Sequence, residues 1–122
     1  MAIPSGSGTE IIKTATLHNQ SNSQSDIFGS TVGSTSTAVP ANHIYIVLSI
    51  TFQEMGGVAE HLYLRVNNGS NDIYLSQISL PASSCFVWND KFAVAAGHSL
   101  RTTLDSSGNV DVYCTYIDQD WT

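Results

Sequence analysis

The sequence contains few charged residues, and basic residues are the scarcest of them. Asp, Glu, Lys and Arg make up 11% of the 122 residues, whereas about 25% is usual in soluble domains. Four Lys and Arg stand against ten Asp and Glu, which gives a formal net charge of −6 at pH 7. Because four cations cannot neutralise a long row of phosphates, the composition predicts neither a nucleic-acid partner nor a polybasic attachment to a membrane.

Long apolar runs and cysteine-rich motifs are also missing. The longest apolar run, residues 44–50, is interrupted by Ser49 and has the length of one strand, far short of a membrane-spanning helix. The first eight residues contain neither the basic region nor the apolar region of a secretory signal. Two cysteines, Cys85 and Cys114, are too few for a disulfide framework. We therefore expect a protein made in the cytoplasm, with both thiols free and packed in its core.

What the sequence does contain is a repeated alternation of apolar and polar residues with the period of β-strands. Residues 60–67 alternate in this way and place Leu62, Leu64 and Val66 inward. The strongest case is residues 43–53, which we predict to be a central strand. Its apolar even-numbered positions would share one inward face: Ile44, Ile46, Leu48, Ile50 and Phe52.

Strand signals recur at short and regular intervals, and no segment shows a helical period. We predict strands at residues 9–18, 43–53, 60–67, 72–79, 85–88, 92–94, 99–104 and 110–117. This spacing predicts an all-β fold, a single antiparallel β-sandwich of jelly-roll-like type with about eight strands. Residues 9–122 would form the sandwich and residues 1–8 a flexible N-terminal arm. Residues 18–37 would form a long polar loop, pinned by Ile27 and Phe28.

Catalytic and metal-binding motifs are missing as well. The chain has no nucleophile elbow, no phosphate-binding loop and no dinucleotide fingerprint. Its four histidines do not stand at metal-ligand spacing: His18, His43, His61 and His98. No pair of carboxylates is marked for acid–base chemistry, so a small glycan-active hydrolase is the weakest of the functions considered. We predict no catalytic residue, no metal, no cofactor and no enzymatic activity.

Aromatic residues at outward positions are candidates for contacts. Tyr63 stands on the outward face of its strand between His61 and Arg65, and an exposed tyrosine beside an arginine is typical of a contact hot spot. We therefore predict that these three residues contact another subunit or a ligand. A larger set of aromatics either forms a sugar-stacking platform or fills the core or an interface: Tyr45, Tyr63, Tyr74 and Trp88. Trp121 either folds back onto its own domain or anchors a subunit interface.

The order of these elements carries a resemblance. Residues 39–43 (VPANH) open the long apolar strand, residues 92–100 (FAVAAGHSL) lead into the next-to-last strand, and residues 108–117 (GNVDVYCTYI) close the domain. Together with the opening MAIPSGSGTE, this succession resembles small structural proteins of tailed bacteriophages, especially phages of marine bacteria and cyanobacteria. The likeness covers residues 1–13 and 39–122.

The resemblance implies a non-enzymatic virion structural protein, most specifically a capsid decoration (cement) protein bound to the outer face of the major capsid lattice. It would be made in the host cytoplasm and reside at the capsid surface. Such proteins are commonly compact β domains, often trimeric, with an N-terminal arm that lies on the capsid. They stabilise the shell because they bind its assembled state. In this chain the contact residues would be Ala2, Ile3 and Pro4 of the arm, joined by Ile27 and Phe28 of the long polar loop.

Two further expectations concern partners. A strand-rich domain exposes sheet edges, and this chain has few charged residues to protect them. We therefore expect self-association, with a homotrimer favoured. The alternative to decoration is a tail, neck or fibre module that binds carbohydrate or another host receptor through exposed aromatics. Copy number separates the two, because a decoration protein covers the whole lattice whereas a tail or fibre module occurs in few copies.

Overall fold

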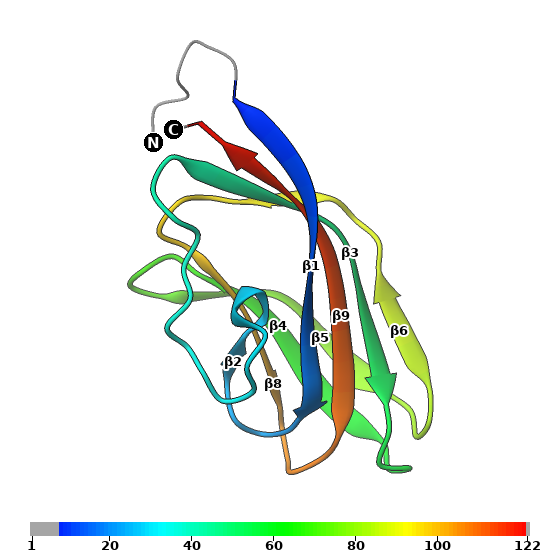
Figure 1. Cartoon of the computed structure of the whole chain (residues 1–122). Coiled ribbons are helices and arrows are strands. Elements are labelled where there is room, and N and C mark those ends of the chain that lie inside the picture. The colour runs from blue at the N-terminus through cyan, green and yellow to red at the C-terminus, as the bar shows by residue number, and fades with distance from the viewer. Residues whose placement is uncertain (1–7, 122) are drawn as a thin grey trace.

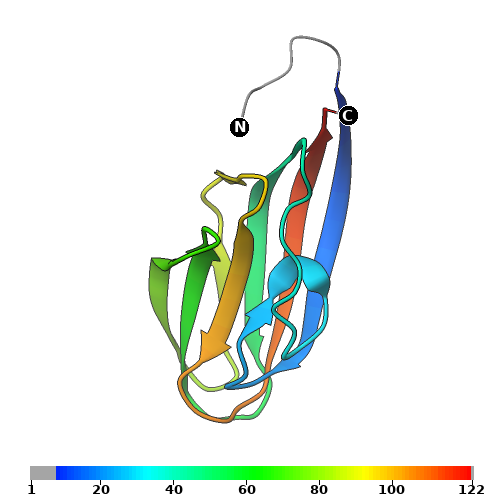
Figure 2. The same ribbon diagram turned by 90° about the vertical axis from the view of Figure 1, so that its left-hand side faces the viewer.

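Two antiparallel β-sheets pack face to face in the computed structural model, which describes residues 8–121 (Figure 1, Figure 2). The five-stranded sheet has the order β1 (Thr9–Gln20), β9 (Val110–Asp120), β3 (His43–Glu54) and β6 (Cys85–Trp88), with β7 (Phe92–Val94) also paired to β3. The four-stranded sheet has the order β2 (Ser25–Asp26), β8 (Ser99–Leu104), β4 (Glu60–Asn67) and β5 (Asp72–Leu80). One 3-10 turn, η1 (Ile27–Gly29), follows β2.

This architecture confirms the predicted all-β, jelly-roll-like antiparallel sandwich. Residues 8–121 form nine strands instead of about eight, and the additional one is the two-residue β2. Within the same range, no helix has the length and apolar character needed to cross a membrane. The predicted N-terminal arm falls almost entirely outside the described residues.

β9 holds the five-stranded sheet together because it pairs on both sides. β1 and β3 run antiparallel to it along nearly its whole length. Its inward positions Val112, Cys114 and Tyr116 are buried, as the alternation predicts. Figure 2 shows that β1, β9 and β3 extend beyond the four-stranded sheet at the end where β1 begins.

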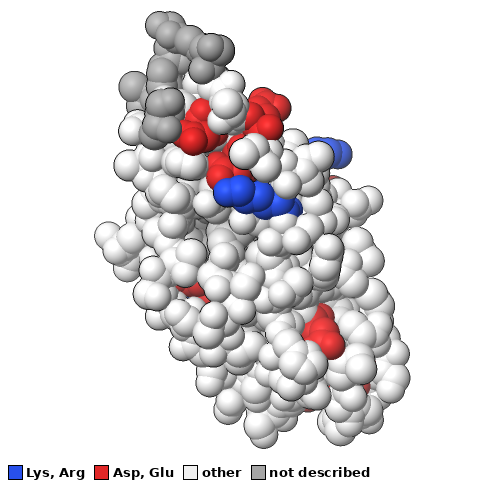
Figure 3. All heavy atoms as spheres, viewed as in Figure 1, with Lys and Arg blue, Asp and Glu red and all other residues white. Residues whose placement is uncertain are grey.

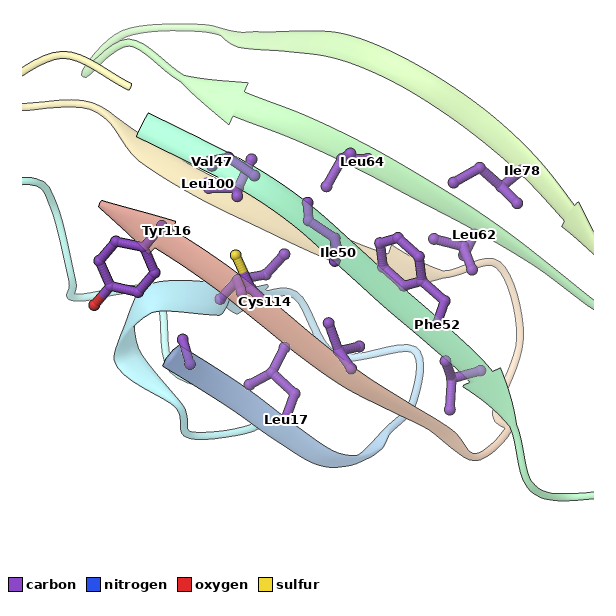
Figure 4. Close-up of a cluster of buried hydrophobic side chains, with 14 of the residues drawn as sticks. Leu17, Val47, Ile50, Phe52, Leu62, Leu64, Ile78, Leu100, Cys114 and Tyr116 are labelled. Atoms are coloured by element: carbon purple, nitrogen blue, oxygen red, sulfur yellow. The ribbon is translucent and has the colours of Figure 1, made fainter. Parts of the chain in front are cut away.

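The core lies between the sheets and receives side chains from both (Figure 4). Val47, Ile50 and Phe52 come from β3, and Leu62 and Leu64 come from β4; all five are fully buried. Burying a side chain of this size contributes about 1.5–3 kcal/mol of hydrophobic free energy. The inward positions predicted for β4 are therefore confirmed for both leucines.

The alternation in β3 changes face in the middle of the strand. Tyr45 and Val47 are buried in the first half, whereas Ile50 and Phe52 are buried in the second half. The pairing of β3 with β9 shows an irregularity between Val47 and Ser49. An extra residue at such a bulge moves every later side chain to the opposite face of the sheet.

The prediction of one inward face for all even-numbered residues of β3 is therefore wrong in its first half. Ile44 and Ile46 lie on the outer face, because they alternate with the buried Tyr45 and Val47. Sequence alternation does not reveal the bulge, since apolar residues occupy both parities there. The bulge places isoleucines on a surface that the sequence pattern assigned to the core.

The segment predicted as a long polar loop carries more structure than expected. β1 continues to Gln20, β2 pairs with β8, and η1 follows. Ile27 belongs to the core, while Phe28 packs against the rings of Tyr45 (centroid distance 4.9 Å) and Tyr116 (4.8 Å). The two side chains pin the segment to the sandwich as predicted, but a loop without secondary structure is the wrong description of it.

A buried carboxylate fastens the turns at one end of the sandwich. Glu54, the last residue of β3, accepts hydrogen bonds from the backbone N–H groups of four residues: Gly56 (2.6 Å), Gly57 (2.8 Å), Val58 (3.2 Å) and Ser83 (2.8 Å). The bond from Ser83 contributes most to holding the pKa of Glu54 below its ordinary value, although burial opposes this shift. The ionised carboxylate therefore ties the β3–β4 turn to the β5–β6 turn.

The two cysteines differ in their surroundings. Cys114 is buried in the core, and burial raises the pKa of its thiol to about 12. Cys85 is exposed on β6 instead, so the prediction of two core cysteines is wrong for this residue. Phe86 and Trp88 pack against the core from the same strand. Alternation along β6 therefore points Cys85 to the outside.

Candidate functional site

Three outward residues of β4 lead to the first candidate surface. His61, Tyr63 and Arg65 project from the outer face of the four-stranded sheet, because they alternate with the buried Leu62 and Leu64. Strand pairing adds their neighbours on β5 and β8. We call this surface the network face and define it by these residues: His61, Tyr63, Arg65, Asp72, Tyr74, Arg101, Thr103 and Asp105.

Arg65 is the centre of the network face. Its guanidinium donates hydrogen bonds to Asp72 (3.4 Å), to the Tyr74 hydroxyl (3.5 Å) and to the Thr103 hydroxyl. The guanidinium carbon lies 5.4 Å from the centroid of the Tyr74 ring. The residue is only 8% exposed. Arg65 therefore links β4 to both neighbouring strands and has little surface left for the partner contact predicted from the sequence.

An edge-to-face series of rings crosses the same face. The centroids of the His61 and Tyr63 rings lie 5.0 Å apart, and those of Tyr63 and Tyr74 lie 5.8 Å apart. The Tyr63 hydroxyl donates to Asp105 (3.2 Å). The pKa of Tyr63 is raised, first by desolvation and then by the negative charge of Asp105. Tyr74 is 54% exposed, so the series ends in a ring that is open to solvent.

The larger sugar-stacking platform considered from the sequence is not assembled. Tyr45 is buried in the core, and Trp88 packs against Phe92 on the other sheet. Of the four aromatics in that set, Tyr63 and Tyr74 contact each other on an outer face of the sandwich, whereas the other two pack toward the core. Aromatic residues that are scattered along the sequence can be grouped only once the strand order is known.

The second arginine of the network face is neutralised as well. Arg101 donates from Nε to Oδ1 of the fully buried Asp26 (2.8 Å), and its Nη1 lies 3.6 Å from Oδ1 of Asp72. Asp72 also accepts a hydrogen bond from Asn67 (2.9 Å). Both arginines are thus paired with carboxylates inside the sheet, which leaves the rings as the main groups for an outside contact.

The outer face of the five-stranded sheet has a different composition. Strand register places its outward side chains in rows across β1, β9 and β3. We call this surface the open face and define it by these residues: Ile12, Thr14, Thr16, His18, Ile46, Thr51, Gln53, Asp111, Tyr113, Thr115 and Ile117. Figure 3 views this side and shows uncharged atoms over most of it. Charged side chains gather toward the end where β1 begins and β9 ends.

A hollow of about 270 Å³ lies at the opposite end of the open face. Its polar and aromatic lining comes from three strands: Thr16 and His18 of β1, Asp111 and Tyr113 of β9, and Thr51 and Gln53 of β3. Tyr113 is 52% exposed although β9 is a central strand. Its outward parity could be read from the inward Val112 and Cys114, but its neighbours across the sheet could not. The sequence prediction therefore missed this group.

A buried ion cluster joins three strands near the charged end of the open face. Asp118 of β9 accepts hydrogen bonds from Nζ of Lys13 on β1 (2.8 Å) and pairs with Nδ1 of His43 on β3 (2.7 Å). Burial opposes the ionisation of Asp118, but the bonds to Lys13 and His43 outweigh it, so its pKa is lowered. The cluster fastens β1 and β3 to β9. Residues 8–121 contain no group of three or more side chains that could hold a metal ion.

The remaining contact residues predicted from the sequence differ in accessibility. Ile27 is 0% exposed and has no surface to offer a partner, which corrects its prediction as a contact residue. Phe28 is half-buried against two tyrosine rings. The other three predicted contact residues lie outside the described residues: Ala2, Ile3 and Pro4.

Trp121 folds back onto its own domain. Its backbone N–H donates to the carbonyl of Asn42 (2.9 Å). The indole lies so close to Gly8 that a Cβ there would come within 2.9 Å of the ring. The residue is half-buried. Of the two alternatives considered from the sequence, the first describes this conformation, and a role at a subunit interface stays a proposal.

Comparisons with known proteins find likeness in structure and none in sequence. No family model matches the chain, and no curated protein matches it. A structure of Bacillus endospore appendages, described as a family of disulfide-linked pili, matches with a TM-score of 0.58 and 12% identity over 100% of this chain and 97% of that chain. A structure of the acid-stable capsid of Helicobacter pylori bacteriophage KHP30 matches with a TM-score of 0.56 and 6% identity over 93% of each chain. At these identities the matches establish a shared sandwich fold.

Proposed function

We propose that this protein is a non-enzymatic structural component of a bacteriophage virion, and specifically a capsid decoration protein on the outer face of the major capsid lattice. The observation that carries the proposal is the likeness to the KHP30 capsid structure over 93% of this chain. The sequence resemblance to structural proteins of tailed phages points in the same direction. On that resemblance alone, we propose a phage of marine bacteria or cyanobacteria.

The capsid contact is assigned to the end of the open face where β1 begins. Ile12 is 69% exposed there, in one row with Ile117 and Ile46. An exposed aliphatic group favours burial against a partner surface. Residues 2–4 precede the same end of β1 in the sequence. The N-terminal arm and the aliphatic row would therefore meet the lattice together.

Edge strands of the two sheets support self-association, and β1 and β5 are the longest of them. Among residues 8–121, β1 pairs only with β9 in its sheet, and β5 pairs only with β4. An edge strand presents backbone N–H and C=O groups that a second chain can meet. We assign these edges to a homotrimer, with Trp121 near the interface. Sedimentation analysis at micromolar concentration tests this assignment, and a monomer would contradict it.

Copy number in purified particles is the primary test of the decoration role. Quantitative mass spectrometry of virions should find the protein in a fixed, high ratio to the major capsid protein. A few copies per particle would instead support the second candidate, a tail, neck or fibre module. The exposed series of rings on the network face favours that candidate as a receptor contact. Absence from the particle would overturn both.

Capsid occupancy of two matched variants tests the assigned contact end. Ile12→Lys places a charge in the aliphatic row and should lower occupancy of purified capsids, as should deletion of residues 2–8. Ile73→Lys is the matched control, because Ile73 is also an exposed isoleucine on an edge strand, but in the other sheet. Occupancy that is undiminished by the deletion, or lowered equally by both lysines, would contradict the assignment.

A further inference from the structure

The hollow on the open face combines six side chains in two neighbouring rows. In the first row, Tyr113 stands directly between Thr16 and Thr51, its Cα partners on β1 and β3. In the second row, Asp111 stands opposite Gln53, and its carboxylate bonds to His18 on the other side. An aromatic ring between two hydroxyl groups thus adjoins a carboxylate between an imidazole and an amide.

The Tyr113 ring is free to stack on a ligand. Within residues 8–121, no ring lies against it, in contrast to Tyr63 and Tyr74, which contact each other. It is 52% exposed in the centre of a sheet, with a hollow beside it. The negative face of an aromatic ring attracts weakly positive C–H groups. A pyranose ring presents such C–H groups on one face and hydroxyl groups around its rim.

The polar groups of the hollow are oriented but not used up. Oδ1 of Asp111 is fixed by the backbone N–H of Asn19 (3.0 Å) and by Nδ1 of His18 (3.1 Å), while Oδ2 has no partner within residues 8–121. Gln53 donates to the carbonyl of Glu54 (3.1 Å), which leaves its Oε1 as an acceptor. The two threonine hydroxyls can both donate and accept. A ligand with many hydroxyl groups matches this set, because each hydroxyl also donates and accepts.

Charge and size narrow the class of ligand. No Lys or Arg lines the hollow, and Asp111 is the one acidic residue in its lining. Asp111 would therefore repel an anionic ligand, and no Lys or Arg in the lining would attract it. The volume of about 270 Å³ is close to the lower end of the range for small-molecule pockets, about 300–1,000 Å³, and suits one or two sugar rings.

We propose that the hollow formed by Thr16, His18, Thr51, Gln53, Asp111 and Tyr113 is a binding site for a neutral saccharide. This proposed saccharide site goes beyond the structural role proposed above and does not depend on that role. Along β1, the hollow begins at Thr16, which is four residues, or about 13 Å of strand, from Ile12 in the row assigned to the capsid. A capsid contact confined to that row would leave this site exposed.

Titration of the isolated protein tests the site. The probes are the neutral disaccharides cellobiose and lactose, with N-acetylneuraminic acid and glucuronic acid as anionic counterparts. We expect saturable changes in ¹H–¹⁵N NMR spectra for at least one neutral disaccharide, centred on β1, β9 and β3 around the hollow. No saturable binding of either neutral disaccharide, or stronger binding of the anionic sugars, would overturn the proposal.

Matched tyrosine variants locate the binding. Tyr113→Ala should weaken the affinity roughly tenfold or more, whereas Tyr74→Ala, at nearly equal exposure on the network face, should leave it unchanged. The reverse result would overturn the proposal and assign binding to the rings of the network face. Thr51→Val keeps the shape of the side chain and removes one hydroxyl, and it should also weaken binding. If its melting temperature is unchanged, the weaker binding does not result from a folding defect. The copy-number measurement in virions tests the proposed structural role, and its outcome is independent of these titrations.

Discussion

The network face and the open face belong to the same sandwich, yet they use their polar side chains in opposite ways. On the network face, Arg65 and Arg101 are paired with carboxylates, and the rings lean on one another. On the open face, Tyr113 and the threonines beside it have no such partners within residues 8–121. The charged groups of the first face are occupied by their own contacts, and its Tyr74 ring alone is widely exposed, whereas the second face keeps both its hydrogen-bonding groups and its ring available.

This difference teaches that a concentration of charged and aromatic residues is a poor guide to a binding surface. Arg65 and Tyr63 attract attention in the sequence because of their residue types. In the structure, Arg65 joins three strands of one sheet. The hydrogen bonds of its Nη atoms add rigidity, although its buried Nε has no partner within residues 8–121, while groups left unpaired at the surface are the ones that a partner can use. The following experiments separate these two roles.

The largest effect is expected on the network face. Arg65→Ala removes the donor to the Thr103 hydroxyl and one of the donors to Asp72, so we expect the free energy of unfolding to fall by about 2–3 kcal/mol. Thr14→Ala on the open face is the control, with an expected change within about 0.5 kcal/mol. Urea unfolding followed by tryptophan fluorescence measures both. Equal losses would show that the two faces do not differ in structural importance.

The next effect belongs to an anchor at the end of the five-stranded sheet. Asp118→Asn should lower the free energy of unfolding by about 1–2 kcal/mol near neutral pH. The pKa of Asp118 lies below its ordinary value of 3.8, so its stabilisation is complete above that value and is lost as the pH falls through the lower value of the folded state. Urea unfolding from about pH 7 to about pH 2 should show that the difference in unfolding free energy between the parent protein and Asp118→Asn disappears in acid. A difference in unfolding free energy that does not change with pH would contradict the ionic role of Asp118.

Glu54 should add to acid sensitivity with the same sign. Its pKa lies below the ordinary value of 4.5, so protonation as the pH falls removes the negative charge and weakens the hydrogen bonds that Glu54 accepts from four backbone N–H groups. Glu54→Gln is therefore expected to be less stable near neutral pH and to lose less stability in acid than the parent protein. The anchors of the five-stranded sheet would then lie at its ends, and its outer face would carry none.

A smaller effect compares one tyrosine from each face. Tyr74→Ala removes the ring next to the Arg65 guanidinium and should cost about 0.5–1 kcal/mol of stability. Tyr113→Ala should change stability by less than about 0.5 kcal/mol, because its ring has no such partner within residues 8–121. The two tyrosines are almost equally exposed, so thermal unfolding isolates the difference in their contacts. A larger loss of stability for Tyr113→Ala than for Tyr74→Ala would contradict the difference described between the two faces.

The smallest expected effect is a difference in chemical reactivity, with no change in stability. It compares a cysteine on the outer face of the five-stranded sheet with a cysteine that the same sheet buries in the core. Iodoacetamide should modify Cys85, which is exposed, and spare Cys114, whose pKa burial raises to about 12. Mass spectrometry of the native protein should therefore find one adduct, and the unfolded protein should show two. Modification of Cys114 in the native protein would mean that the core opens more readily than its packing implies.

Much of the fold follows from the sequence because turn residues and alternation are local signals. β4, β6, β7 and β8 begin and end where the pattern places them. The prediction fails where a local signal is ambiguous. In β3 both parities are apolar, so the bulge after Val47 could not be seen. In β6 the strand is too short for its alternation to decide which residue faces inward.

The candidate site was harder to predict than the fold, because it depends on contacts between distant strands. Alternation predicts that Tyr113 points outward, but the sequence does not show that Thr16 and Thr51 flank it. The same limit explains the error for Arg65. Its outward parity was right, while its burial depends on Asp72, Tyr74 and Thr103 from two other strands.

The double pairing of β9 sets an order of events for a chain that grows from its N-terminus. Among residues 8–121, β1 pairs in its sheet with β9 alone, and the Lys13–Asp118 contact joins residues 105 positions apart. During synthesis, β1 must therefore wait as an unpaired strand until Val110–Asp120 has been made. Long-range pairing of this kind slows folding and prolongs the exposure of strand edges. The last strand acts as the closing step of the sandwich, and the interval before it forms is when this protein is most vulnerable to pairing with the wrong neighbour.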